Sequence, residues 1–411
     1  MVCSQMDKNT LLAAALVCHT WSKICIPFLW ETCFFTAELY GEHHAVFDAH
    51  ASMIRHLDAK HRLIGGDARF IAQQCPNLQT LSLRYCPVTP GTLEVLCVSS
   101  FLIESLTLDR CPGVKSSIVE KLSRLTRLSR LEIIIPTQER GEGDWREEHL
   151  VHLLTHCLEL KTLGIKGPDL SHVHLLRLQS HPTMLELRDL QLISTFLSAD
   201  ALGRLLMKCP SLTALTLLSN ANTNGMLHTI AQNCPRLERL GLRNSKSFST
   251  TAFEQVFKSC PTLRDLDISF TLVQDTAVTT LASQCPHLER LDLTGCSRLT
   301  KDGLREVLER STELRELRVK GCRKLSIAAF SSNEPWACKD RLEFLDMASV
   351  GIVAGIDELE PVIRQWRSMK RLRQLELDDH VGAWPQVSKA IKEITNVRVV
   401  VSPLQSKFGR D

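Results

Sequence analysis

The sequence predicts an α/β solenoid, in which short parallel strands alternate with helices and each strand–helix unit stacks on the next. Three observations predict this fold class. A motif of the form L-x-x-L-x-[LIV] recurs along most of the 411 residues. Several copies follow Cys-Pro, as in "CPNLQTLSL" and "CPHLERLDL". Segments with helical spacing of apolar residues lie between the copies. Such self-similarity at a fixed period is typical of repeat architectures.

The period of the motif is measured between the first apolar residues of successive copies. Most steps are 25 to 28 residues long, one is 30 and one is 32. The twelve first positions are Leu78, Ile103, Leu128, Leu160, Leu187, Leu212, Leu237, Leu263, Leu288, Leu314, Leu342 and Leu372. A weaker terminal copy, "ITNVRVV", starts at Ile394. Twelve copies at a near-constant spacing indicate one stacked array.

Each repeat is expected to contain one strand and one helix. The last two apolar residues of L-x-x-L-x-L alternate as they do in a strand with one buried face. In "TAVTTLASQC" and "KDGLREVLERS" the apolar residues recur at helical spacing, as Leu304, Val307 and Leu308 do. Because a strand is about 4.8 Å wide and a helix about 10 Å, stacking should bend the array, with the strands on the inner wall of a horseshoe.

The 16 cysteines occur at repeating positions. One set precedes proline at the expected helix-to-strand turn: Cys75, Cys209, Cys234, Cys260 and Cys285. A second set falls just after the expected strand: Cys86, Cys111, Cys296 and Cys322. Both sets should point into the interior, where free thiols behave as small apolar groups. Free cysteines at repeating interior positions favour a reducing compartment, and we expect a cytoplasmic or nuclear location.

The fragment "CPHLERLDLTGCSRLTKDGLREVL", residues 285–308, resembles the cysteine-containing subclass of leucine-rich repeats, and "RVKGCRKLS" continues it. The resemblance covers roughly residues 75–380 and implies a leucine-rich-repeat solenoid of the ribonuclease-inhibitor-like horseshoe type. This subclass is typical of F-box proteins, which receive substrates for ubiquitin ligases. The chain is most similar to the fungal F-box family. Leucine-rich arrays serve many binding roles, so the resemblance speaks more strongly for the fold than for the function.

The stretch "TLLAAALVCHTWSKICIPFLW", residues 10–30, is apolar on more than one helical face. It resembles the second half of an F-box, and the resemblance implies that a ligase adaptor subunit docks there. The implied adaptor-binding residues are Leu11, Leu12, Leu16, Val17, Trp21, Pro27, Leu29 and Trp30. The first F-box helix, of the type L-P-x-E-[IL]-L, has no counterpart before Leu11, so we expect an incomplete F-box. The alternative is that the stretch only caps the first repeat.

Four segments are expected along the chain. They are a partial F-box at 1–35, a connector and N-terminal cap at 36–69, about 12 leucine-rich repeats at 70–393, and a C-terminal cap and tail at 394–411. A short strand is possible at "SMIRHL" in the connector. The longest repeat step contains the charged insertion 136–149, which we expect to form a loop. Its Trp145 either contacts a partner or folds back onto the array.

The residues between the buried strand positions should face the concave wall, where solenoids usually dock their partners. The candidate target-binding residues are Arg84, Asp109, Lys166, Arg243, Asp267, Asp292, Arg318, Lys320 and Asp346. Their charges are mixed, which could steer a charged partner. The alternative is a solvated face without a specific role.

Several other functions are not supported by the sequence. The net charge of +3 gives no reason to expect a nucleic-acid or membrane partner, and no apolar run reaches the ~20 residues of a membrane helix. Asp7 before the apolar run argues against a signal peptide. We find no phosphate-binding glycine loop and no G-x-S-x-G, and expect neither an enzyme nor a cofactor. The histidines of "HLVHLLTHC" should lie on the outer face of a helix rather than bind metal.

These observations lead to one functional hypothesis and one rival. The chain is expected to be the substrate-recognition subunit of an SCF-type cullin-RING ubiquitin ligase. Its F-box remnant would bind the adaptor and, through it, a cullin, while the concave face would hold a target protein. The chemistry would then be done by other subunits, through proximity. The rival is a non-catalytic leucine-rich-repeat scaffold or inhibitor without any link to a ligase.

Overall fold

The computed structural model describes most of the chain in two compact units. The N-terminal unit comprises Met1–Leu197 and Lys208–Ser211, and the C-terminal unit comprises Ser198–Met207 and Leu212–Asp411. The described residues are 6–35, 45–60, 71, 73–99, 102–114, 116–136, 145–218, 223–332, 334–350, 359–378, 387, 389 and 397–402. No helix among these residues is long and apolar enough to cross a membrane.

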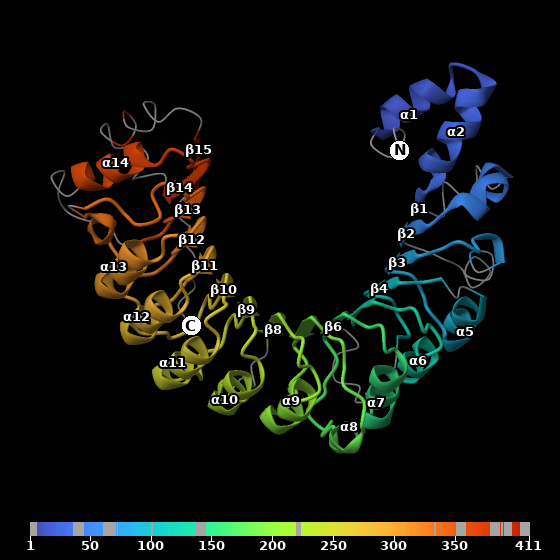
Figure 1. Ribbon diagram of the computed structural model, residues 1–411, viewed down its shortest axis with the longest axis horizontal. Helices are drawn as coiled ribbons and strands as arrows, with labels where there is room; N and C mark the ends of the chain where they lie inside the picture. The colour runs from blue at the N-terminus through green and yellow to red at the C-terminus, as the bar shows by residue number, and fades with distance from the viewer. Residues whose placement is uncertain are drawn as a thin grey trace. The chain divides into compact units, whose positions relative to one another are not determined.

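The N-terminal unit begins with a helical pair and continues as alternating strands and helices. Its seven strands are parallel and follow one another in chain order (Figure 1). The elements are α1 Lys8–Ala15, α2 His19–Trp30, β1 Thr32–Phe35, η2 Ala51–Met53, β2 His56–Lys60, β3 Thr80–Arg84, α5 Pro90–Ser99, β4 Ser105–Asp109, α6 Ser116–Leu122, β5 Arg130–Ile134, α7 Glu147–His156, β6 Thr162–Lys166, α8 Leu176–Ser180 and β7 Asp189–Ile193.

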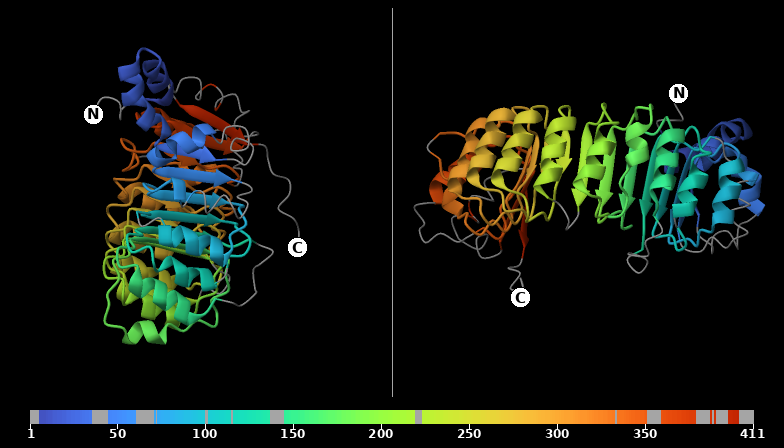
Figure 2. Two further views of the ribbon diagram at one scale, coloured as in Figure 1. Left: turned by 90° about the vertical axis from the view of Figure 1, so that its right-hand side faces the viewer. Right: turned by 90° about the horizontal axis from the view of Figure 1, so that it is seen from below.

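The C-terminal unit repeats the same plan, with parallel strands in one layer and helices in the other (Figure 2). Its elements are α9 Ala199–Leu206, β8 Ala214–Leu218, α10 Asn224–Asn233, β9 Arg239–Gly241, α11 Thr250–Ser259, β10 Asp265–Asp267, α12 Asp275–Gln284, β11 Arg290–Asp292, α13 Lys301–Arg310, β12 Glu316–Arg318, η4 Ile327–Phe330, β13 Phe344–Asp346, α14 Leu359–Ser368, β14 Gln374–Asp378 and β15 Arg398–Ser402.

The predicted repeat positions form the interior of both units. The first apolar residue of all twelve motif copies is at most 4% exposed. The strand leucines also pair in register from repeat to repeat, as Leu266 does with Leu291 and Leu291 with Leu317. Burying one such leucine stabilises the fold by about 1.5–3 kcal/mol, so each repeat contributes its own share of the core. The predicted α/β solenoid is therefore confirmed.

Strand ends in the C-terminal unit are shaped by a recurring turn. The carboxylates of Asp267 and Asp292 each accept a hydrogen bond from the backbone N–H two residues later, at 3.0 and 2.8 Å. The next residue adopts a left-handed conformation, which is Gly295 (φ 69°) in one repeat but Phe270 (φ 57°) in the preceding one. The two positions lie against each other, because a Cβ placed on Gly295 would sit 2.6 Å from the Phe270 ring. Only glycine fits at residue 295 without a rearrangement of its neighbour.

Neighbouring repeats also share helix caps. Asp275, the first residue of α12, accepts hydrogen bonds from the Thr300 N–H at 2.8 Å and the Thr300 hydroxyl at 2.7 Å. Thr300 is itself the N-cap of α13. Two repeats earlier, the Asn224 side chain accepts from the N–H of Ser249, the N-cap of α11, at 2.7 Å. The backbone groups at helix starts, which lack partners within their own helix, are thereby bonded between repeats.

All nine cysteines of the two predicted sets are buried, as the sequence predicts. The Cys296 thiol lies 3.3 Å from the Ile268 carbonyl and the Cys322 thiol 3.0 Å from the Leu293 carbonyl, each in the preceding repeat. Burial raises the pKa of the Cys260 and Cys285 thiols to about 12. These groups are therefore protonated, unreactive parts of the core.

The structure differs from the predicted organisation in two places, and it decides between the two alternatives for Trp145. The strand expected near "SMIRHL" is found slightly later, at β2, and β1 precedes it, so the sheet begins at Thr32. Residues 137–144 of the predicted insertion loop lie outside the described residues, whereas 147–149 already belong to α7. Trp145 is only 5% exposed, so it folds back onto the array. The Trp145 side chain is large and apolar, so it is buried in the interior although charged residues flank it in the sequence.

Candidate protein-binding surfaces

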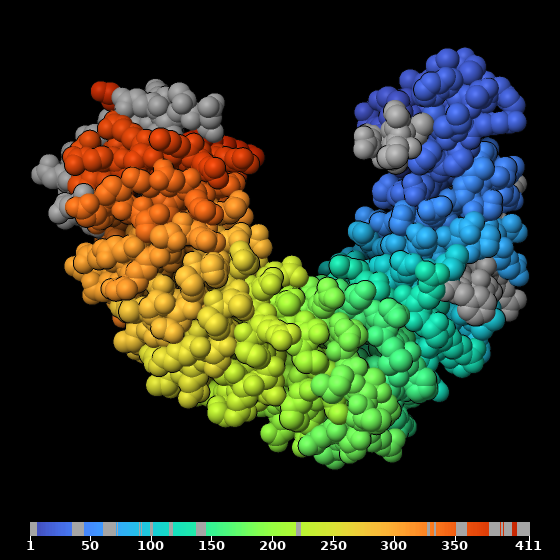
Figure 3. Space-filling view, viewed as in Figure 1, coloured from blue at the N-terminus to red at the C-terminus, as the bar shows by residue number. Residues whose placement is uncertain are grey.

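The chain starts with a two-helix element that packs on the first strands. Helices α1 and α2 contact each other, and α2 contacts β1 and η2. Leu11 and Cys25 form the buried side of this pair, at 4% and 0% exposure. The ring of Trp30 stacks on His50 with 4.7 Å between ring centres. In the space-filling view, these dark-blue residues form the end of the N-terminal unit (Figure 3).

Several large apolar side chains of the same pair are exposed to solvent. Leu12, Leu16, Val17, Trp21 and Ile24 are 43–80% exposed. We call these five residues the N-terminal apolar surface. Leu12 and Leu16 are one helical turn apart, and Trp21 and Ile24 follow on α2, so they share helical faces. Concentrated exposure of large apolar groups typically marks an interaction site.

The predicted adaptor-binding residues divide into three groups. Leu12, Leu16, Val17, Trp21 and Pro27 are exposed, while Leu29 and Trp30 are half-buried. Leu11 is buried and supports the surface from beneath, so its contact with an adaptor stays a prediction. It packs inward because an apolar helix pair must first cover its own interface. Sequence reasoning missed Ile24, which continues the helical spacing from Trp21 and could have been found that way.

On the N-terminal unit, the predicted target-binding side chains lie on the strand layer and pair with their neighbours. The Arg84 guanidinium lies 3.1 Å from the Asp58 carboxylate on the adjacent strand. Lys166 pairs with Glu132 on β5. Asp109 is 4.0 Å from Arg110, whose guanidinium also hydrogen-bonds to the Tyr85 hydroxyl. These side chains form a polar face of paired charges.

On the C-terminal unit, the register aligns one row of charged residues across the sheet. Asp267, Asp292, Arg318, Asp346 and Glu376 occupy successive paired positions on β10 to β14. Arg243 lies just beyond this row and approaches Asp267 at 4.0 Å. Lys320 lies two residues after Arg318 and is half-buried. The structure thus brings the predicted residues of this unit together on one face.

Arg318 is the centre of this row. Its guanidinium is 3.2 Å from the Glu316 carboxylate and lies 4.5 Å from the centre of the Phe344 ring. A cation–π contact of this kind fixes a side chain that would otherwise be mobile. An ordered arginine beside an aromatic ring is typical of residues that dominate protein interfaces.

Burial perturbs two carboxyl groups of the row. Desolvation raises the pKa of Asp346 to about 6, and the Glu376 carboxylate adds to the rise, whereas the Ala348 N–H opposes it. Asp346 is 5% exposed, and its carboxylate accepts a hydrogen bond from the Ala348 N–H in the turn after β13. Its contact with a target protein stays a prediction. Burial also raises the pKa of Asp267, against hydrogen bonds from Ser269.

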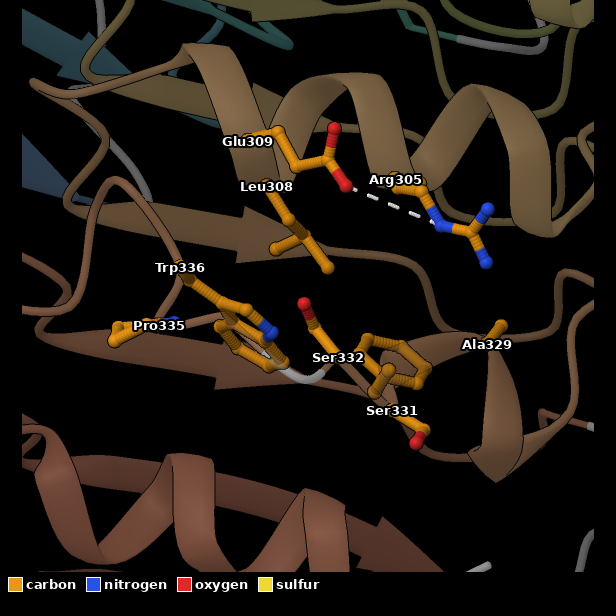
Figure 4. Close-up of a pocket in the computed structure, with 9 residues that line it drawn as sticks. Arg305, Leu308, Glu309, Ala329, Ser331, Ser332, Pro335 and Trp336 are labelled. Carbon is orange, nitrogen blue, oxygen red and sulfur yellow. Dashed lines mark ion pairs between the residues drawn. The ribbon is translucent and has the colours of Figure 1, made fainter.

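A small hollow on the helix side is not a substrate pocket. It lies between α13 and the segment after η4, where Leu308, Ser332 and Trp336 face one another and the Arg305–Glu309 ion pair stands above (Figure 4). Its empty volume of about 240 Å³, which includes open solvent, is smaller than the roughly 300–1,000 Å³ of ligand pockets. The described residues also contain no group of three or more metal ligands.

The fold and these surfaces define a leucine-rich-repeat solenoid with exposed faces suited to binding proteins. Residues 284–308 match the family described as "Leucine Rich repeat". A solved chain from the "Crystal structure of Rad7 and Elc1 complex in yeast" has a similar fold, with a TM-score of 0.57 and 16% sequence identity. The similarity covers 96% of this chain and 94% of that chain.

Proposed function

We propose that this chain is the target-recognition subunit of an SCF-type ubiquitin ligase. The N-terminal apolar surface would bind the adaptor subunit, as part of an F-box remnant, and the adaptor would link the chain to a cullin. The strand layer would hold the target protein. The chain itself would catalyse no step, and the complex would act in the cytoplasm, the nucleus or both.

The N-terminal apolar surface is the observation that carries the proposal. A helix pair that needs only to cap the solenoid would turn its apolar side chains inward, as Leu11 and Cys25 do. Leu16 and Val17 instead remain 80% and 71% exposed. Burying five such side chains against a partner could contribute several kcal/mol, at about 1.5–3 kcal/mol for each fully buried residue. The resemblance of this stretch to an F-box supports an adaptor as the partner.

The structural neighbour supports a partner-binding role more generally. Its printed title describes a complex of two proteins, Rad7 and Elc1. By analogy, a chain with this fold can work as one component of an assembly. The target would lie along the paired strands, where Arg318 and Phe344 offer an ordered anchor. The rival function, a scaffold or inhibitor without a ligase, uses the same strand layer but leaves the N-terminal apolar surface without an adaptor.

The test is a binding measurement between the purified 411-residue chain and a purified F-box adaptor. The variant Leu16→Asp with Val17→Asp changes two exposed residues and should leave the core intact. We expect the wild-type chain to bind and this variant to lose binding. The matched control is Leu158→Asp, which places a charge on a leucine that is 54% exposed outside this surface. Failure of the wild-type chain to bind any adaptor would favour the scaffold.

A further inference from the structure

The C-terminal unit carries a concentration of positive charge that the proposed function leaves unused. It lies in two stretches: residues 339–343, which lead into β13, and residues 360–373, which cover most of α14 and the turn into β14. Together they contain seven Lys and Arg residues against three Asp and Glu residues, an excess of four positive charges. The whole chain has a net charge of only +3. So concentrated a charge favours binding of a partner of opposite sign.

The exposed face of α14 is basic. The helix turns its apolar side chains inward, as the fully buried Trp366 does. Arg364 and Arg367 are three residues apart and lie together on the exposed face. Lys370 and Arg371 follow in the turn after the helix and are also exposed. Basic side chains therefore continue from the middle of the helix into the turn.

A second turn brings a further arginine to the same end of the repeats. Phe344 of β13 pairs with Gln374 of β14, and Arg341 and Arg371 each lie three residues before these paired positions. The N–H of Gln374 also donates to the Glu343 carbonyl at 3.1 Å, so the register holds where the strands begin. Neighbouring parallel strands are about 4.8 Å apart. Arg341 therefore lies in the turn adjoining that of Arg371.

Two of the basic residues in these stretches already have acidic partners. The Arg367 guanidinium is 3.4 Å from the Glu360 carboxylate, and the Arg373 guanidinium is 3.8 Å from the Glu343 carboxylate. Four other exposed cations have no ion pair and no side-chain hydrogen bond with another described residue. They are Arg341, Arg364, Lys370 and Arg371, and we call them the basic surface. Their charges are therefore available to a partner.

The fold alone does not account for the basic surface. Cations near the C-terminus of a helix are stabilised by the helix dipole, which explains Lys370 and Arg371 after α14. The dipole effect falls off within the last turn, whereas Arg364 lies in the middle of this helix and Arg341 belongs to the preceding repeat. Like charges held together without counter-charges repel one another and lower stability slightly. An anionic partner would remove this repulsion.

We propose that the basic surface binds an acidic segment of another protein. Arg364 and Arg371 are seven residues apart, which corresponds to about 10 Å along a helix. An extended chain advances about 3.3 Å per residue, so three or four residues span that distance and place two carboxylates on one side. Arginine favours this partner, because its planar guanidinium can bind a carboxylate through two parallel hydrogen bonds. Because no adaptor-binding residue belongs to the basic surface, adaptor binding and this interaction can be tested separately.

A nucleic acid or a membrane fits the basic surface less well. Four cations are fewer than the roughly 6–10 phosphate contacts of a typical DNA-binding protein. Single-stranded nucleic acids also stack their bases on aromatic side chains, whereas Trp336 and Trp366 are buried. Segments that bind membranes combine cations with exposed apolar groups, but residues 339–343 and 360–373 expose no large apolar side chain.

The test measures binding of a fluorescein-labelled octaglutamate peptide to the full chain by fluorescence anisotropy at about 20 mM salt. The basic-surface variant replaces all four cations, as Arg341→Gln, Arg364→Gln, Lys370→Gln and Arg371→Gln. We expect it to bind the peptide at least roughly fourfold more weakly than wild type, since each of four exposed ion pairs contributes modestly. The control variant removes four exposed cations elsewhere in the same unit, as Arg236→Gln, Lys246→Gln, Lys258→Gln and Arg298→Gln. It has the same net charge and should bind as wild type does.

Two further measurements keep the result decisive. The far-ultraviolet circular dichroism of both variants should match wild type, and if the basic-surface variant is misfolded, Arg364→Gln with Arg371→Gln should show a smaller loss in the same direction. An eight-thymidine oligonucleotide and phosphatidylserine vesicles should bind more weakly than the peptide. Tighter binding of either one, equal peptide affinity of the basic-surface and control variants, or no peptide binding at millimolar concentration would overturn the proposal.

Discussion

Replacing Gly295 by alanine tests how tightly two neighbouring repeats are packed. Gly295 has φ 69°, a left-handed conformation that costs roughly 1–2 kcal/mol for a residue with a Cβ. The new Cβ would also lie 2.6 and 2.8 Å from two carbons of the Phe270 ring. Overpacking of this kind costs about 1–3 kcal/mol. We therefore expect Gly295→Ala to lower the free energy of unfolding by about 2–5 kcal/mol in total.

Gly321 supplies the matched control. It has the same φ of 69°, but the nearest atoms to an added Cβ are 4.0 Å away. Gly321→Ala should therefore lower the free energy of unfolding only by the cost of the left-handed backbone conformation, about 1–2 kcal/mol. In a Phe270→Ala background, Gly295→Ala should cost no more than this control. Urea unfolding followed by circular dichroism measures all four variants. If Gly295→Ala and Gly321→Ala lowered the free energy of unfolding equally in the wild-type background, the packing argument would be refuted.

Three further predictions follow from the charges and thiols. Burial raises the pKa of Asp346 from its ordinary value of 3.8 to about 6 in the folded protein. The folded state is therefore at full stability with respect to this group below about pH 4, and it loses stability as the pH rises through about 6, because the buried carboxyl must then ionise. Asp346→Asn should therefore be more stable than wild type at pH 7, by about 2–3 kcal/mol, and this gain should shrink at pH 4 in urea titrations. Glu289 lies 2.7 Å from Arg264 and 3.6 Å from Arg315, so Glu289→Gln should cost about 0.5–1 kcal/mol at low salt and almost nothing in 1 M NaCl. Among the described cysteines, Cys18 should react first with Ellman's reagent, since thirteen of the other fourteen are buried; rapid labelling of several thiols in the native protein would contradict this.

The interior of the repeats could be predicted from the sequence because burial there is periodic. Each motif copy repeats the same apolar positions, and Leu78 and Leu372 lie in equivalent environments although almost 300 residues separate them. The start of the sheet could not be predicted in the same way, because β1 has the sequence "TCFF" without the full motif. Strand pairing with β2, a long-range contact, defines it instead.

The candidate surfaces were predicted less completely than the core. Helical spacing places Leu11 and Leu12 in one apolar segment, but it does not say which of them faces the neighbouring helix. The structure buries the first and exposes the second. The same limit applies to Asp346, because strand alternation assigns it to the outer face while the turn after the strand encloses it. Phe270 shows a third kind of exception, since its left-handed position is occupied by glycine in the next repeat.

The in-register pairing of neighbouring strands has a consequence for folding and for change by mutation. Within each unit, a strand pairs with strands about one repeat away, as Asp267 does with Gly241 and Asp292. The loop that must close to add a repeat is therefore about equally long at every step, and its entropic cost does not grow with the length of the array. Folding can spread from any stable pair of repeats to the next. A substitution on one exposed strand position can alter partner choice locally, while the register of the remaining strands stays as it is.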